Sequence, residues 1–322
     1  MFFSSGADVP PRLMFYGRTL PELRGGRMEY FLNQLINGTA QGAIYALMAI
    51  GYSVIVGVVG MVTFTYGEIM MIGAFGSFYI FQYLGSNLFL AIPAAFAASF
   101  LLGIVVYKVC YERFFYAPRH ISLLCTIGFS MLMKNLVQIV FGPETKPVLN
   151  IIENTTYTLH LGNVALDLKL LQIVIMALVI VLAVSLTLFF NKTKAGVALR
   201  AVSQNKDAAY LMGINVKRTA MLGNCIGCGF GGIAGVLLSI YYYAISTTMW
   251  GNLSMKAFSA SVLGGLVDLR LSALGGLLMG IIENLGITVS SATFRDVFAF
   301  AFLILMLVIR PQGFAQKKGG RV

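Results

Sequence analysis

Three ionisable side chains lie inside stretches of sequence that are otherwise apolar. Glu68 stands at the start of one stretch, Glu283 lies deep in another, and Lys134 lies in a third with Asn135 beside it. A charged group inside a membrane is costly unless it faces protein, water or a partner. We therefore interpret these residues as candidates for a transport pathway or a gate. A structural role stays open, because a helix N-terminus favours Glu68 and interhelical bonding could hold Lys134.

Glycines recur every fourth position in two of the apolar stretches. Gly227, Gly231 and Gly235 form one series, and Gly276 and Gly280 form another. Small residues at this spacing let two membrane helices approach closely. We expect both series to lie at helix–helix contacts.

Apparent enzyme motifs in the first glycine series do not fit their usual context. The G-x-G-x-x-G and C-x-x-C patterns between 225 and 232 lie in mid-stretch, whereas a dinucleotide loop follows a strand and opens a helix. The two histidines fall in predicted loops on opposite sides of the membrane, and a metal site needs more ligands. Neither a Walker A sequence nor G-x-S-x-G nor H-E-x-x-H occurs. We expect no catalytic residue, no metal and no cofactor held by this chain.

The elements that must carry these residues are membrane helices. Hydrophobic residues make up 58% of the 322, charged residues only 11%, and mean hydropathy is +0.83. About 20 apolar residues are needed to cross the hydrocarbon core. The candidate spans are 32–58, 66–84, 88–109, 121–141, 169–190, 217–243, 271–290 and 294–310, with 255–267 as a ninth span or a re-entrant segment. The prediction is an all-α polytopic protein with eight or nine transmembrane helices.

The net charge of +11 comes from basic residues in short loops, which does not indicate nucleic-acid binding. Loop 191–218 and the C-terminal tail are basic, whereas 143–168 is acidic. The positive-inside rule places the first two in the cytoplasm and the third outside. Residues 148–168 alternate loosely and contain turn signals, so they predict a small external β-hairpin, with a disordered loop as the alternative.

The predicted organisation has three parts. Residues 1–27 are an extension that fits no span, and either a start at Met28 or a real cytoplasmic tail explains them. Residues 28–314 form the transmembrane domain, and 315–322 form a basic cytoplasmic tail. The chain is expected in the cell (inner) membrane with its C-terminus in the cytoplasm.

The cytoplasmic segment 195–215 contains a short predicted helix with an apolar surface. Asn205 can cap this helix and Gly213 can end it. An apolar knob in water needs a protein partner. The residues expected to contact that partner are Arg200, Asn205, Asp207, Ala208, Ala209, Leu211, Met212 and Gly213.

The same segment resembles a known family. Asp207-Ala208-Ala209-x-x-x-Gly213 resembles the E-A-A-x-x-x-G coupling loop of ABC importer permeases, with Asp in place of Glu. Its flanks resemble the branched-chain amino acid permeases of the LivH type. Other stretches agree over nearly the whole chain, namely 42–47 with 51–52, 64–68, 256–258 and 262–265.

The resemblance implies an assembly and a set of roles. A second permease of the LivM type, two ATP-binding cassette subunits, an external amino-acid-binding protein and surrounding lipid are the implied partners, with ATP bound by the cassettes. Import of leucine, isoleucine and valine is the implied function. Urea or short-amide transport in the same family and a stand-alone secondary transporter or channel are the alternatives. The residues placed near the path or its gates are Thr63, Tyr66, Glu68, Lys134, Asn135, Lys256 and Glu283.

Three positions depart from the pattern of that family. Tyr66 and Thr63 stand where the motif has His and Asn, and Lys134 stands where a glutamine is common. A tyrosine does not titrate near neutral pH as a histidine does. A gate that is switched by protonation at position 66 is therefore not expected.

Overall fold

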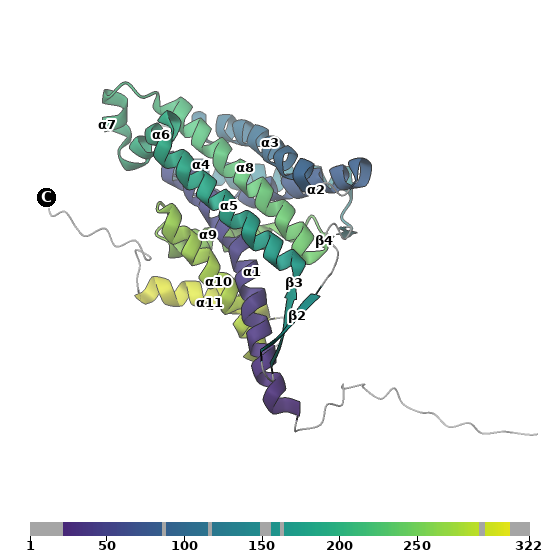
Figure 1. Ribbon diagram of the computed structural model, residues 1–322. Helices are drawn as coiled ribbons and strands as arrows, with labels where there is room; N and C mark the ends of the chain where they lie inside the picture. The colour runs from purple at the N-terminus through teal and green to yellow at the C-terminus, as the bar shows by residue number, and fades with distance from the viewer. Residues whose placement is uncertain are drawn as a thin grey trace, which may run out of the picture.

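The computed structural model describes residues 22–85, 88–114, 118–148, 156–161, 164–289 and 294–309. Helices dominate this part of the chain (Figure 1). The helices are α1 (Glu22–Val59), α2 (Tyr66–Leu84), α3 (Leu88–Val106), α4 (Arg119–Phe141), α5 (Leu170–Lys192), α6 (Lys194–Gln204), α7 (Lys206–Leu211), α8 (Val216–Tyr242), α9 (Trp250–Leu263), α10 (Leu269–Val289) and α11 (Arg295–Ile309). A π-helical turn, η1 (Tyr107–Glu112), continues α3.

Within the described residues, six helices are long and apolar enough to cross a membrane. They are Tyr30–Val59, Leu88–Glu112, His120–Phe141, Leu170–Lys192, Val216–Tyr242 and Leu269–Thr288. The segments expected at 66–84, 255–267 and 294–310 also contain helices, but α9 has 14 residues and α11 has 15. Helices of that length are shorter than the roughly 20 residues of a full crossing. The expected count of eight or nine crossings is therefore not confirmed.

The centre of the bundle is α1, which packs against α5, α8, α9 and α10. Close approach depends on small residues, because a Cβ on Gly276 would collide with the backbone of Ala46, and one on Gly280 with Gly42. The series on α8 lies at similar contacts. A Cβ on Gly227 would lie 2.5 Å from Ile55, and one on Gly231 2.8 Å from the Tyr66 ring.

The next glycine of the α8 series completes this contact. A Cβ on Gly235 would collide with the carbonyl of Met70 on α2. The α8 series thus faces α1 and α2, and the α10 series faces α1.

Two short antiparallel pairs of strands accompany the helices. Strands β2 (Thr156–Leu161) and β3 (Val164–Lys169) pair in register from Thr156↔Lys169 to Leu161↔Val164. Strand β1 (Lys146–Pro147) pairs with β4 (Ala244–Ile245). Figure 1 shows β2 and β3 beside the early part of α1, at the opposite end of the molecule from α6 and α7. Their position outside the membrane stays a prediction.

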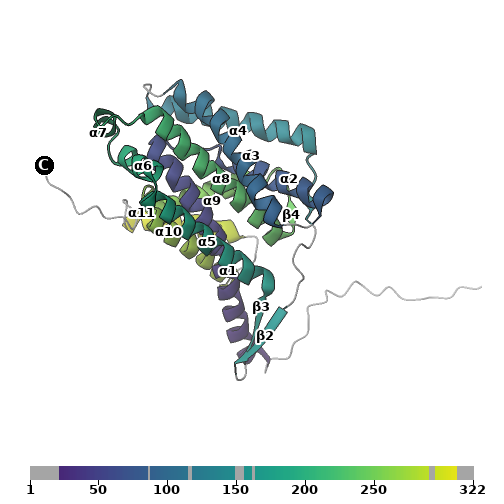
Figure 2. The ribbon, with the colours of Figure 1, turned by 45° about the horizontal axis from the view of Figure 1, so that its top comes forward.

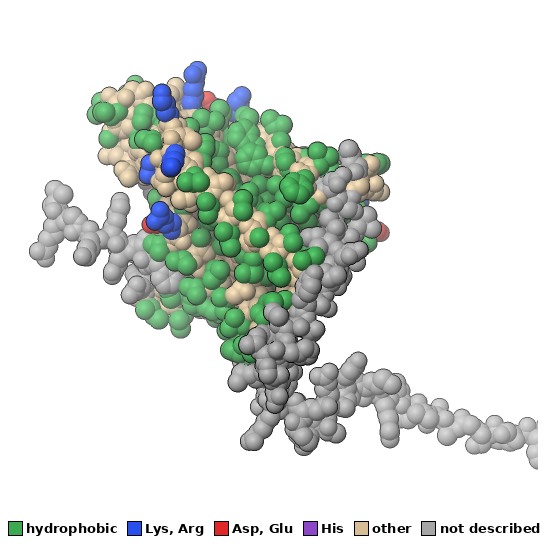
Figure 3. Space-filling model, viewed as in Figure 1, with side chains coloured by type: hydrophobic (Ala, Val, Ile, Leu, Met, Phe, Trp, Pro, Cys, Tyr) green, Lys and Arg blue, Asp and Glu red, His purple; other side chains and the backbone are tan. Residues whose placement is uncertain are grey.

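The end of the molecule that carries α6 and α7 is also where basic side chains gather in the view of Figure 3, whereas apolar side chains cover the middle. Helix α4 lies at the periphery, along one edge of the bundle (Figure 2). Its apolar side chains are largely exposed, with Ile139 80% and Val140 69% accessible. This distribution fits a protein whose flanks face lipid.

Residues 1–21 and 310–322 lie outside the described residues, so the basic tail and most of the N-terminal extension are not described. Helix α1 begins at Glu22, before Met28. The start at Met28 remains a hypothesis.

Candidate functional site

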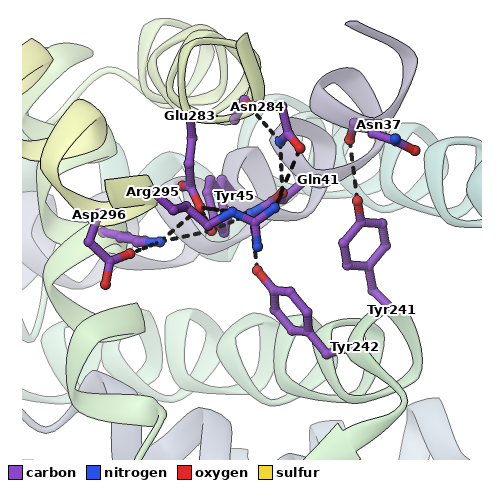
Figure 4. A network of polar contacts seen from close by, with 11 residues as sticks. Asn37, Gln41, Tyr45, Tyr241, Tyr242, Glu283, Asn284, Arg295 and Asp296 are labelled. Carbon is purple, nitrogen blue, oxygen red and sulfur yellow. Dashed lines mark hydrogen bonds and ion pairs between the residues drawn. The ribbon is translucent and has the colours of Figure 1, made fainter. Parts of the chain in front are cut away.

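Four charged side chains from three helices meet between α9, α10 and the start of α11 (Figure 4). The ammonium of Lys256 lies 3.0 Å from Oε1 of Glu283 and 2.7 Å from Oδ1 of Asp296. The guanidinium of Arg295 lies 3.0 Å from the same Glu283 oxygen. Two cations and two anions therefore balance, and we call this group the ion cluster.

Neutral side chains from α1 extend the ion cluster toward the centre of the bundle. The amide of Gln41 donates to Oε1 of Glu283 at 3.1 Å, and the Tyr45 hydroxyl donates to the same oxygen at 3.3 Å. The Gln41 amide also lies 3.0 Å from the Tyr242 hydroxyl on α8. Asn284 donates to Oε1 of Gln41 at 2.8 Å. Helices α1, α8, α9, α10 and α11 all contribute to one polar network.

The network is buried where its charges meet. Glu283 is fully inaccessible and Lys256 is 4% exposed, whereas the side chains of Arg295 and Asp296 are 28% and 44% exposed. Buried charges are tolerated only when they are paired and hydrogen-bonded. Nevertheless, Oε2 of Glu283 accepts no hydrogen bond within the described residues. A buried carboxylate with one free oxygen can accept a further donor, such as water or an ammonium group, without breaking its existing contacts.

The local sequence explains how this geometry arises. The close contact of Gly276 and Gly280 with α1 brings α10 against the turn of α1 that bears Gln41 and Tyr45. Lysine can reach this centre from α9 because its long aliphatic stem is compatible with burial. The ammonium lies 5.6 Å from the centroid of the Tyr45 ring, which adds a cation–π contact.

The structure separates the predicted path residues into three places. Lys256 and Glu283 meet in the ion cluster. Thr63 and Tyr66 lie instead at the turn between α1 and α2, where the Tyr52 hydroxyl donates to the Thr63 carbonyl at 2.8 Å and the Tyr66 hydroxyl donates to the Met48 carbonyl at 3.1 Å. Tyr66 is completely buried, and its contacts in this conformation are helix-packing contacts.

Glu68 faces α4 rather than the ion cluster. The side chain of Ser130 is within hydrogen-bonding reach of its carboxylate, and the positive charge of Lys134 acts on it. Glu68 is 5% exposed and its Oε2 accepts no hydrogen bond in the described part of the chain. Asn135 is exposed on α4 and donates to the Met131 carbonyl of its own helix at 2.7 Å. Lys134 and Asn135 are therefore not brought together with Lys256 and Glu283.

The predicted cytoplasmic helix is present as α7 and carries an exposed apolar tip. Asn205 Oδ1 accepts from the backbone N–H groups of Asp207 and Ala208 at 3.0 and 3.1 Å, as an N-cap does. Gly213 ends the turn with a φ of +81°. The tip, defined here as Tyr210, Leu211 and Met212, is 73%, 84% and 82% exposed. Ala209 is buried against the bundle, and Ala208 is exposed.

Arg200 contacts α5 and lines a cavity. Its guanidinium donates to Asn191 Oδ1 at 3.0 Å, and it lines an open cavity of about 950 Å³ together with Ser53, Phe190 and Arg270. This cavity lies between α1, α5, α6 and the turn that precedes α10. Arg200 thus lines a cavity that holds both charged and apolar side chains.

Sequence reasoning missed Gln41, Tyr45, Arg295 and Asp296. A signal was available for the last two, because an adjacent Arg-Asp pair opens the apolar stretch 294–310. No such signal marks Gln41 and Tyr45, since a single amide and a tyrosine are common in membrane helices. Among the described residues, no group of three or more His, Cys, Asp or Glu side chains could hold a metal ion.

Comparison of the sequence with known proteins identifies a family. Residues 34–307 match the family model for the branched-chain amino acid transport system permease component. The high-affinity branched-chain amino acid transport system permease protein LivH of Escherichia coli K12 is 35% identical over 88% of this chain and 95% of its own length. The corresponding BraD protein of Pseudomonas aeruginosa is 32% identical over the same shares.

The name of a more distant relative gives another class of transported compound. The fructose import permease protein FruF of Bifidobacterium longum is 23% identical over 85% of this chain and 76% of its own length. No solved structure matches the chain. The match of the family model to most of the chain, with the two closer relatives, shows that this protein belongs to the family of permease components of branched-chain amino acid transport systems.

Proposed function

We propose that this chain is a membrane-spanning subunit of an ATP-driven importer for leucine, isoleucine and valine. A second permease of the LivM type, two ATP-binding cassette subunits and an external binding protein complete the assembly. The names of LivH and BraD support the substrate class. The observation that carries the proposal is the tip of α7, because its three large side chains are more than 70% exposed at the end of the molecule where basic side chains gather, which fits a protein interface better than a lipid contact.

The proposed orientation of the chain in the membrane is set by the side on which α7 lies. Helices α6 and α7 face the cytoplasm in this proposal, with the C-terminus on the same side, and the β2–β3 hairpin faces outside toward the binding protein. Basic side chains near α6 and α7 support this orientation by the positive-inside rule (Figure 3).

The ion cluster is proposed as part of a gate on the transport path. Its four charges come from helices that must separate or slide if a path opens between them, and ion pairs can be exchanged between two arrangements of packed helices. Glu68 with Lys134 is proposed as a second polar contact, between α2 and α4.

Co-purification from native membranes tests the assembly. A tagged chain should bring down two ATP-binding cassette subunits and a related permease. Proteoliposomes that contain the complex and the binding protein should then take up labelled leucine only with ATP, and labelled urea and fructose serve as competing substrates. Transport by the lone chain without ATP would overturn the proposal in favour of a secondary transporter, and preference for urea or fructose would overturn the substrate.

A further inference from the structure

Lys206, the first residue of α7, reaches back to the end of α1. Its ammonium donates to the carbonyl of Val59, the last residue of α1, at 2.6 Å. Figures 1 and 2 both show α7 at the end of the bundle where α1 ends. The contact joins residues that are 147 positions apart in the chain.

The chemistry of a helix C-terminus explains why a lysine suits this place. The last carbonyls of a helix lack intrahelical donors and carry partial negative charge, so a cation there is favourable. Gly60 completes the arrangement with a φ of +76°, and its N–H donates to the Val56 carbonyl at 2.8 Å. A Cβ on residue 60 would lie 3.0 Å from the Lys206 ammonium, so glycine also leaves room for the side chain.

Helix α1 connects this contact with the ion cluster. Tyr45 and Gln41, which both donate to Glu283, precede Val59 by 14 and 18 residues in the same helix. At the rise of an α-helix these intervals correspond to about 21 and 27 Å. A helix that is packed on several sides moves largely as one body, so displacement of its end is felt along its length.

We infer that Lys206 is a positioning residue that couples α7 to α1, so that movement of α7 by the ATPase shifts Gln41 and Tyr45 relative to Glu283. The inference rests on the proposed function and adds a route from the coupling helix to the gate. Lys206 is half-buried and its ammonium is directed at Val59, whereas the tip residues of α7 face outward. The residue therefore acts through α1 and not by direct contact with the ATPase.

The test uses the complete complex in proteoliposomes and compares Lys206→Met with Lys206→Arg and with Lys194→Met. Lys194 is an exposed lysine at the start of α6, so its variant removes the same charge nearby. We expect Lys206→Met to assemble and hydrolyse ATP normally but to lower leucine uptake per ATP by roughly fivefold or more, as typical coupling between sites would predict. Lys206→Arg should restore most of this ratio, and Lys194→Met should leave it unchanged.

A second measurement separates this inference from the proposed function. Amide hydrogen exchange of residues 56–60 in the purified complex should accelerate in Lys206→Met and not in Lys194→Met, whether or not the preparation transports. Wild-type protein without ATP-driven uptake would overturn the proposed function. Wild-type transport with unchanged uptake per ATP in Lys206→Met would overturn only the coupling route. Loss of ATPase subunits from Lys206→Met would show direct contact instead and would also overturn it.

Discussion

Lys256 on α9 and Glu283 on α10 form an ion pair of 3.0 Å in which neither side chain is more than 5% exposed. The pair is embedded in hydrogen bonds from α1, so it links three helices at once. Replacing a buried pair by neutral groups is often tolerated, but removing one partner leaves an uncompensated charge. The pair therefore holds the helices together only while both charges are present.

Lys256→Met should destabilise the protein by at most about 3–5 kcal/mol, because Glu283 stays buried and keeps Arg295 as its single cation. The double variant Lys256→Met with Glu283→Gln should be less destabilised, since no charge is then left fully buried and the charges of the partly exposed Arg295 and Asp296 sum to zero. Thermal or denaturant unfolding of the purified protein in detergent measures both. This account would be contradicted if the loss of stability in the double variant equalled the sum of the losses in Lys256→Met and Glu283→Gln alone.

Asp296→Asn should cost much less than loss of Glu283. Its side chain is 44% exposed, and pairs of that kind contribute about 0–1 kcal/mol. In the same unfolding measurement the stability of Asp296→Asn should be close to that of the wild type. The remaining difference in stability between the two should shrink at high salt. Destabilisation as large as that of Lys256→Met would mean that Asp296 is buried in the assembled state.

Hydropathy and composition are sufficient to predict a helical membrane protein here, because apolar runs of 20 residues have few other structures available. The cap at Asn205 and the turn at Gly213 were also predictable, since both depend on local backbone chemistry. The ion cluster was only half predictable. Lys256 and Glu283 are unusual within apolar sequence, but their contact depends on the packing of α9 against α10, which no local pattern encodes.

The separation of Glu68 from Glu283 also depends on helix packing, which no local sequence pattern encodes. Both carboxylates are conspicuous in sequence, and a sequence argument places both near the path. Only the three-dimensional packing shows that one faces α4 and the other α1. The number of membrane crossings is also hard to predict from sequence. Apolar stretches led us to expect crossings at α9 and α11, but these helices are too short to count as crossings by length.

Gly235→Ala should destabilise the bundle, because the added methyl group would collide with the Met70 carbonyl on α2. Overpacking of this kind costs typically about 1–3 kcal/mol. Gly128→Ala is the matched control, since a Cβ at that position on α4 meets nothing within 4 Å. Thermal unfolding of both variants in detergent is the measurement, and equal midpoints would contradict the packing of α8 against α2.

Leu211→Ser should leave the folded chain intact while weakening its association with the ATPase. The side chain is 84% exposed, so its loss removes almost no contact within the described bundle. Burial of an apolar side chain at an interface contributes about 1.5–3 kcal/mol, which corresponds to roughly tenfold or more in affinity. Retention of the ATPase on a tagged chain is the measurement. Leu188→Ser, on an exposed part of α5, is the control that should retain the ATPase normally.

Gly213→Val should uncouple transport, whereas Gly213→Asn should be tolerated. The φ of +81° at this position is strained for a β-branched residue, at a cost of about 1–2 kcal/mol, but asparagine adopts left-handed conformations more readily. Space does not decide the outcome, because a Cβ at Gly213 meets nothing within 4 Å. Uptake of labelled leucine, measured alongside recovery of the assembled complex, separates the two variants. Equal uptake by Gly213→Val and wild type, with normal assembly, would show that the turn after α7 does not need its left-handed geometry to transmit movement from the ATPase.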